Sequence, residues 1–187
     1  MIRHPLLVVF QFACAAAIAA VSHFAAAAEK ACEEAPFTFA LSVLGENENR
    51  DGAWEGLDLL ESPDHRAERI QFTVRPERAA RVTLDVLEEG GPRRLFPALG
   101  QDPVLAKGRS YALPGPSEFY ELDGAARLRL TVTPATASGQ GLEPRLADVA
   151  GAATRVRFPL SDGAKFETSQ RLYRARGAGR LELDLHR

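Results

Sequence analysis

The sequence predicts an all-β protein built as an immunoglobulin-like antiparallel β-sandwich. Apolar and polar residues alternate one by one in several short segments, which is the pattern of strands with one buried face. Glycine- and proline-containing turns separate these segments. A chain of 187 residues is long enough for one domain with a sizeable core. A short helix over Leu142–Ala150 is the one departure from the all-β pattern that we expect.

Residues 1–28 have the composition of a secretory signal peptide. Arg3 supplies a short positive region, Leu6–Val21 is apolar apart from one glutamine, and Ala26–Ala28 forms a small-residue cleavage site. We therefore expect a bacterial protein that is periplasmic or secreted, with no transmembrane segment once the signal is removed. An uncleaved anchor is the alternative, because Leu6–Ala28 is long enough to span a bilayer.

The rest of the chain divides by composition. We expect an N-terminal arm over residues 29–36 and the sandwich core over 37–134. Small residues at 135–141 predict a linker, and residues 142–187 form a C-terminal extension that can complete a sheet. Cys32 is the only cysteine after the signal, so no internal disulfide can form and the fold must rest on core burial.

The first strands follow from clear alternation. Phe37–Val43, Arg69–Val74 and Ala80–Leu87 each place apolar residues at every second position. Glu88–Pro92 contains adjacent glycines and predicts a hairpin into a short strand at Leu95–Phe96.

The later strands are less regular. We expect strands at Arg109–Leu113 and Val156–Phe158, and a last strand marked by Leu181, Leu183 and Leu185. Phe119–Leu122 and Ala126–Thr133 are predicted to form a hairpin around Asp123-Gly124, with either Phe119 or Tyr120 facing Leu128.

One loop has the oxygen-ligand spacing of a calcium site. Asn47, Asn49, Asp51 and Asp58 stand at ligand positions, and Gly52 stands at the sharp turn. The first and last ligands differ from the usual Asp and Glu, and a strand precedes the loop where a helix is usual. A plain polar loop is the alternative interpretation.

The usual signs of an enzyme or of a cofactor site are missing from the sequence. His65 and His186 are the only histidines after the signal, so a multi-histidine metal site cannot form. The sequence contains neither a nucleophile elbow nor a phosphate-binding loop. We therefore predict no cofactor. A hydrolase that uses His65 with a loop serine is an alternative that no motif supports.

Two groups of residues are candidates for a binding surface. The first is a set of aromatic side chains that are expected either to form a recognition patch or to pack in the core. These are Phe96, Tyr111, Phe119 and Tyr120.

The second group lies in the basic C-terminal tail. Residues 151–187 hold eight basic residues against four acidic ones, whereas residues 29–64 hold ten acidic residues against two basic ones. Arg171, Arg174 and Arg176 are expected to meet an acidic envelope polymer or protein, unless they lie on an ordinary solvated face. No basic patch is interleaved with aromatics, so nucleic acid is not an expected partner.

Several short signals occur in the order found in a known family. These are Leu95-Phe96-Pro97, Ala106-Lys107-Gly108 and Tyr111-x-Leu113-Pro114, followed by an apolar strand. Over residues 66–133 the chain resembles the bacterial family called domain of unknown function 4384. The resemblance implies an extracytoplasmic β-rich module, often attached to kinase-like or caspase-like proteins, with no activity and no catalytic residues of its own.

Together these features predict a non-enzymatic exported binding or accessory module of the bacterial envelope that acts by protein–protein interaction. The alternatives are an unrecognised periplasmic hydrolase and a calcium-stabilised structural protein.

Overall fold

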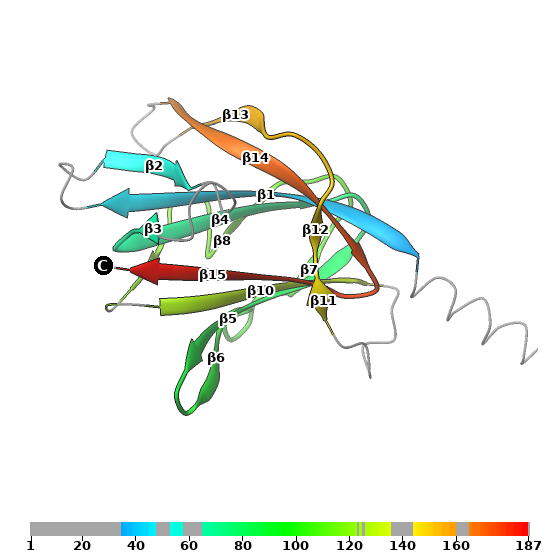
Figure 1. The fold of residues 1–187 in the computed structure, drawn as a ribbon, viewed down its shortest axis with the longest axis horizontal. Coiled ribbons are helices and arrows are strands. Elements are labelled where there is room, and N and C mark those ends of the chain that lie inside the picture. The colour runs from blue at the N-terminus through cyan, green and yellow to red at the C-terminus, as the bar shows by residue number, and fades with distance from the viewer. Residues whose placement is uncertain are drawn as a thin grey trace, which may run out of the picture.

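The fold consists of two β-sheets packed face to face (Figure 1). This computed structural model describes residues 35–47, 53–57, 65–122, 124, 126–135, 144–159 and 165–186. None of these residues is helical. The predicted all-β class and two-sheet arrangement are confirmed.

Sheet A is antiparallel throughout its described pairs. Its order is β12 (Asp148–Val149), β14 (Lys165–Arg176), β1 (Pro36–Asn47), β4 (Arg69–Pro76) and β8 (Tyr111–Leu113). Three further strands pair at its margins: β13 (Thr154–Pro159) with β14, β2 (Ala53–Leu57) with β1, and β9 (Tyr120–Glu121) with β4.

Sheet B contains both antiparallel and parallel pairs. Its order is β11 (Arg145–Leu146), β15 (Gly179–His186), β10 (Ala126–Pro134), β5 (Ala80–Glu88) and β6 (Gly91–Phe96). In addition, β3 (His65–Arg66) pairs with β15, and β7 (Val104–Leu105) pairs with β5. The short strands β11 and β3 run parallel to β15.

The core lies between the sheets and is filled by the alternating residues. The predicted inward positions of β1, β4 and β5 are all buried, as are Leu183 and Leu185 of β15. For β1, β4 and β5 these positions are Phe37, Phe39, Leu41, Val43, Ile70, Phe72, Val74, Val82, Leu84 and Val86. The predicted hairpin between β5 and β6 is also present, with Gly91 at a φ of 113°.

The predicted helix over Leu142–Ala150 is wrong. Its described part forms the short strands β11 and β12, which cross from sheet B to sheet A. The backbone N–H groups of Ala147 and Ala150 donate to carbonyl oxygens of β15 and β14, and that of Arg145 donates to Ala178 O in the turn between these strands. Because these donors are used between strands, no helical hydrogen bonds form here.

The predicted hairpin between Phe119–Leu122 and Ala126–Thr133 is also wrong. The strand β9 pairs with β4, where Tyr120 lies opposite Ile70. The strand β10 pairs on both sides with longer strands, so that Leu128 lies opposite Val86 and Leu183. Neither Phe119 nor Tyr120 faces Leu128, because β5 and β15 occupy both edges of β10.

The segment expected as a C-terminal extension supplies strands to the interior of both sheets. The long strand β14, which was not predicted, lies beside β1 with Tyr173 opposite Phe39. The strand β15 returns to pair with β10, as expected of the last strand. The two-sheet body therefore runs from β1 to residue 186.

The connection from β14 to β15 carries the chain from sheet A to sheet B in a very short turn. Gly179 opens β15 at a place where neighbouring side chains are close. A Cβ at this position would lie 2.7 Å from the Cβ of Ala175 and 3.2 Å from the Phe39 ring. A side chain larger than hydrogen therefore does not fit without movement of the core.

We expect Gly179→Ala to lower the free energy of unfolding by about 1–3 kcal/mol, because the added methyl group overpacks this corner. Gly90→Ala is the control, since a Cβ there meets nothing within 4 Å, and its effect should stay within about 0.5 kcal/mol. Urea denaturation of both variants measures the difference. Equal stability of the two variants would show that the corner is not tightly packed.

Candidate binding surface

The predicted aromatic residues do not form one exposed patch. Phe96 is buried in the core with 4% of its surface exposed. Tyr111 and Tyr120 are half-buried against the core at one margin of sheet A. Phe119 is half-buried and stacks on Trp54, with their ring centroids 4.2 Å apart. The core-packing interpretation therefore holds for Phe96. The two tyrosines lie at the margin of sheet A, whereas Phe119 packs on Trp54.

The predicted arginines lie on β14 but are not equivalent. Arg174 and Arg176 are exposed near the end of the strand. Arg171 is half-buried, interacts with other residues and lies opposite Leu41 of β1. Only Arg174 and Arg176 are therefore available as exposed cations.

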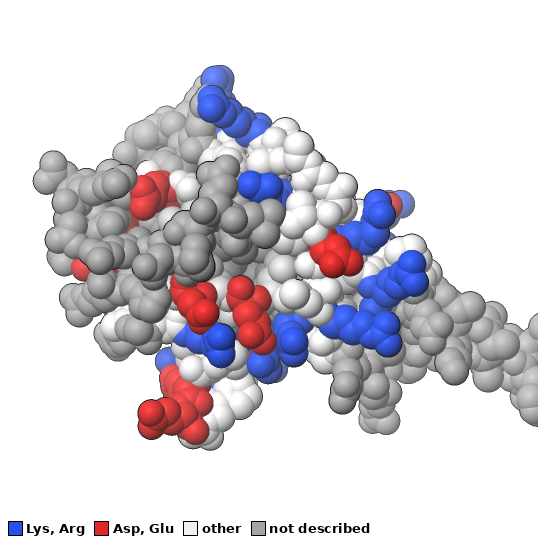
Figure 2. Space-filling model, viewed as in Figure 1, with Lys and Arg blue, Asp and Glu red and all other residues white. Residues whose placement is uncertain are grey.

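The structure brings further exposed basic residues to the same end of the sandwich. This is the end where β1, β5 and β15 begin and where β4, β10 and β14 finish, at the right in Figure 1. The set, which we call the basic end, consists of Arg75, Arg81, Lys107, Arg109, Arg145, Arg174 and Arg176. Figure 2 shows several basic side chains toward this end, with a few acidic ones among them.

Hydrogen bonds between loops and strands hold the basic end together. Gly108, which follows Lys107, donates its backbone N–H to Pro76 O at 2.7 Å. Arg145 donates its backbone N–H to Ala178 O at 3.0 Å, close to the β14–β15 turn. Among the described residues, no ion pair involves any side chain of the basic end. Its positive charge is therefore directed at solvent, although the acidic residues Glu77 and Asp148 lie nearby in sequence and register.

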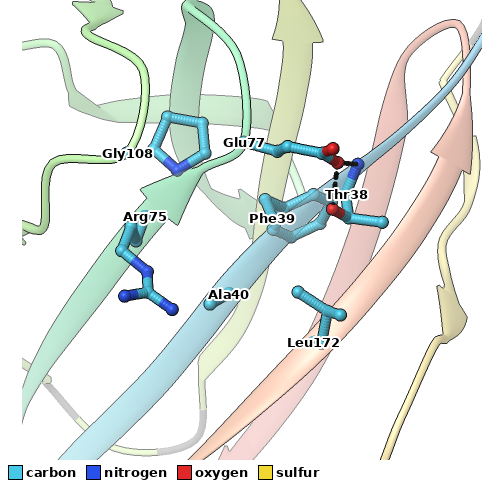
Figure 3. A pocket seen from close by; sticks show the side chains of 8 residues that line it. Thr38, Phe39, Ala40, Arg75, Glu77, Gly108 and Leu172 are labelled. Carbon is cyan, nitrogen blue, oxygen red and sulfur yellow. Dashed lines mark hydrogen bonds between the residues drawn. The ribbon is translucent and has the colours of Figure 1, made fainter.

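A shallow hollow lies on the outer face of sheet A beside this end. It has a volume of about 300 Å³, and Ala40 forms part of its floor. Ala40 lies opposite Leu172 on one side and Arg75 on the other, so a small side chain stands between two large ones. Figure 3 shows Arg75 and Leu172 on the two sides of Ala40.

Glu77 closes one end of the hollow and is held by Thr38. The backbone N–H of Thr38 donates to Glu77 Oε2 at 3.2 Å, and the Thr38 hydroxyl donates to the same oxygen. The hydroxyl bond is the largest cause of a lowered pKa of the Glu77 carboxyl, with smaller contributions from nearby Arg78 and Lys107. Glu77 is therefore already engaged, whereas Arg75 has no ion-pair partner among the described residues.

The chemistry of this arrangement is that of binding. A guanidinium group stays protonated and cannot act as a general base. It can hold a carboxylate through two parallel hydrogen bonds, while Ala40 and Leu172 offer apolar contact to an aliphatic stem.

The predicted calcium loop lies mostly outside the described residues. Asn47 ends β1, and Asn49, Asp51 and Asp58 are not described. His65, on which the hydrolase alternative depends, lies in β3, but its side chain is not described. Both hypotheses stay predictions. The described part of the chain contains no group of three metal-ligating side chains.

Part of the basic end can be predicted from the sequence. Arg75 and Arg81 flank a short turn between two clearly predicted strands, so they must lie at the same end of the sandwich. The approach of Lys107, Arg109 and Arg145 to that end depends on pairing between distant segments, which alternation does not reveal.

Comparisons with known proteins find no relative. No protein-family model matches the chain, and no curated protein and no solved structure is significantly similar to it. The resemblance over residues 66–133 to domain of unknown function 4384 therefore stays a prediction. Within the residues described, no helix is long and apolar enough to cross a membrane.

We expect Glu77→Gln to destabilise the protein at pH 7 by less than about 1 kcal/mol, because the carboxylate is exposed. Since the folded state lowers the pKa of Glu77, its stabilising contribution is present above the unfolded pKa of about 4.3 and is lost as the pH falls through the folded value. The cost of the substitution should therefore be smaller at pH 3 than at pH 7.

Urea denaturation of the wild type and the variant at both pH values measures this difference. Glu89→Gln, at the exposed tip of the β5–β6 hairpin, is the control and should cost little at either pH. A cost for Glu77→Gln that does not change with pH would contradict the role of the carboxylate charge.

Proposed function

We propose that this protein is a non-enzymatic binding module of the bacterial envelope, and that its basic end binds an acidic segment of a partner protein. The observation that carries the proposal is the gathering of seven exposed basic side chains, without ion-pair partners among the described residues, at one end of a protein with a net charge of −2. Cations grouped in this way attract an anionic partner and orient it.

The hollow on sheet A adds a specific contact site to this general attraction. An acidic side chain that reaches Arg75 has its aliphatic part beside Ala40 and Leu172. Arg174 lies on the same face two residues beyond Leu172, opposite Thr38 on one side and Asp148 on the other. The two arginines stand on either side of β1 and suit two acidic side chains of a segment that crosses the sheet.

Export from the cytoplasm and the immunoglobulin-like topology belong to the same proposal. The signal-like composition of residues 1–28 supports export, and the two largely antiparallel sheets are compatible with an immunoglobulin-like arrangement. The resemblance to the family of unknown function supports an accessory role without catalysis. Salt should weaken the interaction, because the cations that carry it are exposed.

We expect Arg174→Gln with Arg176→Gln to weaken binding of poly-glutamate, used as the acidic probe, by about two- to thirtyfold at low salt. Each exposed ion pair contributes about 0.2–1 kcal/mol, and two are lost. Fluorescence anisotropy with a labelled probe measures the affinity, and raising the salt concentration should reduce binding by the wild type.

Arg127→Gln with Arg129→Gln is the matched control. It removes the same charge from sheet B, where these two arginines already pair with Asp184 and Glu182. Equal loss of affinity in both double variants, or binding that does not respond to salt, would contradict the proposal. Crosslinking in the native envelope followed by mass spectrometry then identifies the partner, whose contact with the basic end the same variants test.

A further inference from the structure

A second concave site lies at the opposite end of the sandwich from the basic end. It is a groove of about 480 Å³ between the β5–β6 hairpin and the segment around β9. Both walls belong to margins of the fold: β6 is the last strand on its side of sheet B, and β9 pairs only with β4. The groove therefore opens between the unpaired edges of the two sheets.

The groove is lined by both apolar and acidic residues. Val86, Leu95 and Leu122 contribute apolar side chains. Glu88, Glu89 and Glu121 line the same groove, and Arg93 is the only basic residue among its described lining. The Arg93 guanidinium already pairs with Glu88 at 2.6 Å.

This leaves Glu89 and Glu121 with no ion-pair partner in the described part of the chain. The groove therefore complements a ligand that combines apolar and basic groups.

Tyr120 lines the groove, but its hydroxyl oxygen is covered by protein atoms. Its hydroxyl is buried and has no hydrogen-bond partner among the described residues. Burial is the largest cause of the raised pKa of this phenol, and the nearby Glu118 adds to it, so the hydroxyl keeps its proton and can donate. A buried hydroxyl without a partner is unfavourable, so its removal should not destabilise the free protein.

Tyr111, a half-buried tyrosine on the same margin of sheet A, differs in this respect. Its phenol oxygen accepts a hydrogen bond from the backbone N–H of Ala106 at 2.9 Å. The two tyrosines therefore form a natural comparison, because one is engaged within the protein and the other is not.

We infer that this groove binds an extended, basic segment of a second partner protein. An apolar side chain of the segment contacts Val86, Leu95 and Leu122, and basic side chains on its neighbours reach Glu89 and Glu121. The free edges of β6 and β9 offer backbone hydrogen bonds to the segment. This site is separate from the basic end, so the protein joins an acidic partner at one end to a basic partner at the other.

The test uses an acetylated and amidated hexapeptide of alternating lysine and valine, titrated by calorimetry into the purified protein. We expect Glu89→Gln with Glu121→Gln to weaken binding about two- to thirtyfold and to reduce its dependence on salt, because two ionic contacts are lost. Tyr111→Phe should lower the stability of the free protein and leave peptide affinity unchanged. Tyr120→Phe should leave peptide affinity unchanged and the stability of the free protein unchanged or higher, because its hydroxyl is covered and has no partner among the described residues.

Three results would overturn the inference. The first is absence of peptide binding, and the second is binding that the double glutamate variant does not change. The third is self-association of the free protein, measured by sedimentation equilibrium, that is lost both in the double glutamate variant and in Arg174→Gln with Arg176→Gln. That result would identify the occupant as the basic end of another copy. Peptide binding that survives Arg174→Gln with Arg176→Gln separates this site from the basic end.

Discussion

Phe39 joins the first long strand of the chain to the last two. Its ring stacks on Tyr173 of β14 with centroids 5.7 Å apart, and a Cβ on Gly179 of β15 would lie 3.2 Å from the same ring. Because β14 belongs to sheet A and β15 to sheet B, one buried side chain contacts both layers where the chain passes between them. Both sheets therefore depend on this contact, since β14 is the neighbour of β1 and β15 is the neighbour of β10.

The same connection determines where charge gathers on the surface. The strand β14 ends beside the start of β1, which places Arg174 and Arg176 near Arg75 at the end of β4. The β5–β6 hairpin extends from the opposite end and carries Glu88 and Glu89. A chain with a small net charge thus has ends of opposite sign, and each end lies beside a concave surface. This separation is the physical basis for two binding sites with different preferences.

The sequence predicts the strands that have one constant buried face. Phe37–Val43 and Arg69–Val74 are examples, because each second residue enters the core along the whole segment. The strand β14 escapes prediction because its buried face changes: Thr168 and Gln170 are buried in its first half, and Tyr173 and Ala175 in its second. The Asp123-Gly124 sequence leads to the opposite error, a predicted hairpin that does not form. Its local turn pattern is outweighed by the pairing of β9 with β4. Binding residues follow the same rule: local charge predicts Arg174 and Arg176, whereas the groove around Tyr120 depends on contacts between distant segments.

Amide hydrogen exchange of the native protein, followed by mass spectrometry, tests most directly whether the C-terminal strands are integral to the fold and hold the basic end rigid. The account predicts that peptides covering residues 171–176 and 180–185 exchange as slowly as those covering β1 and β10, because all four segments open together in one cooperative unit. Exchange that is many times faster in β14 and β15, while β1 and β10 stay protected, would contradict it. The basic end would then not be a preformed surface.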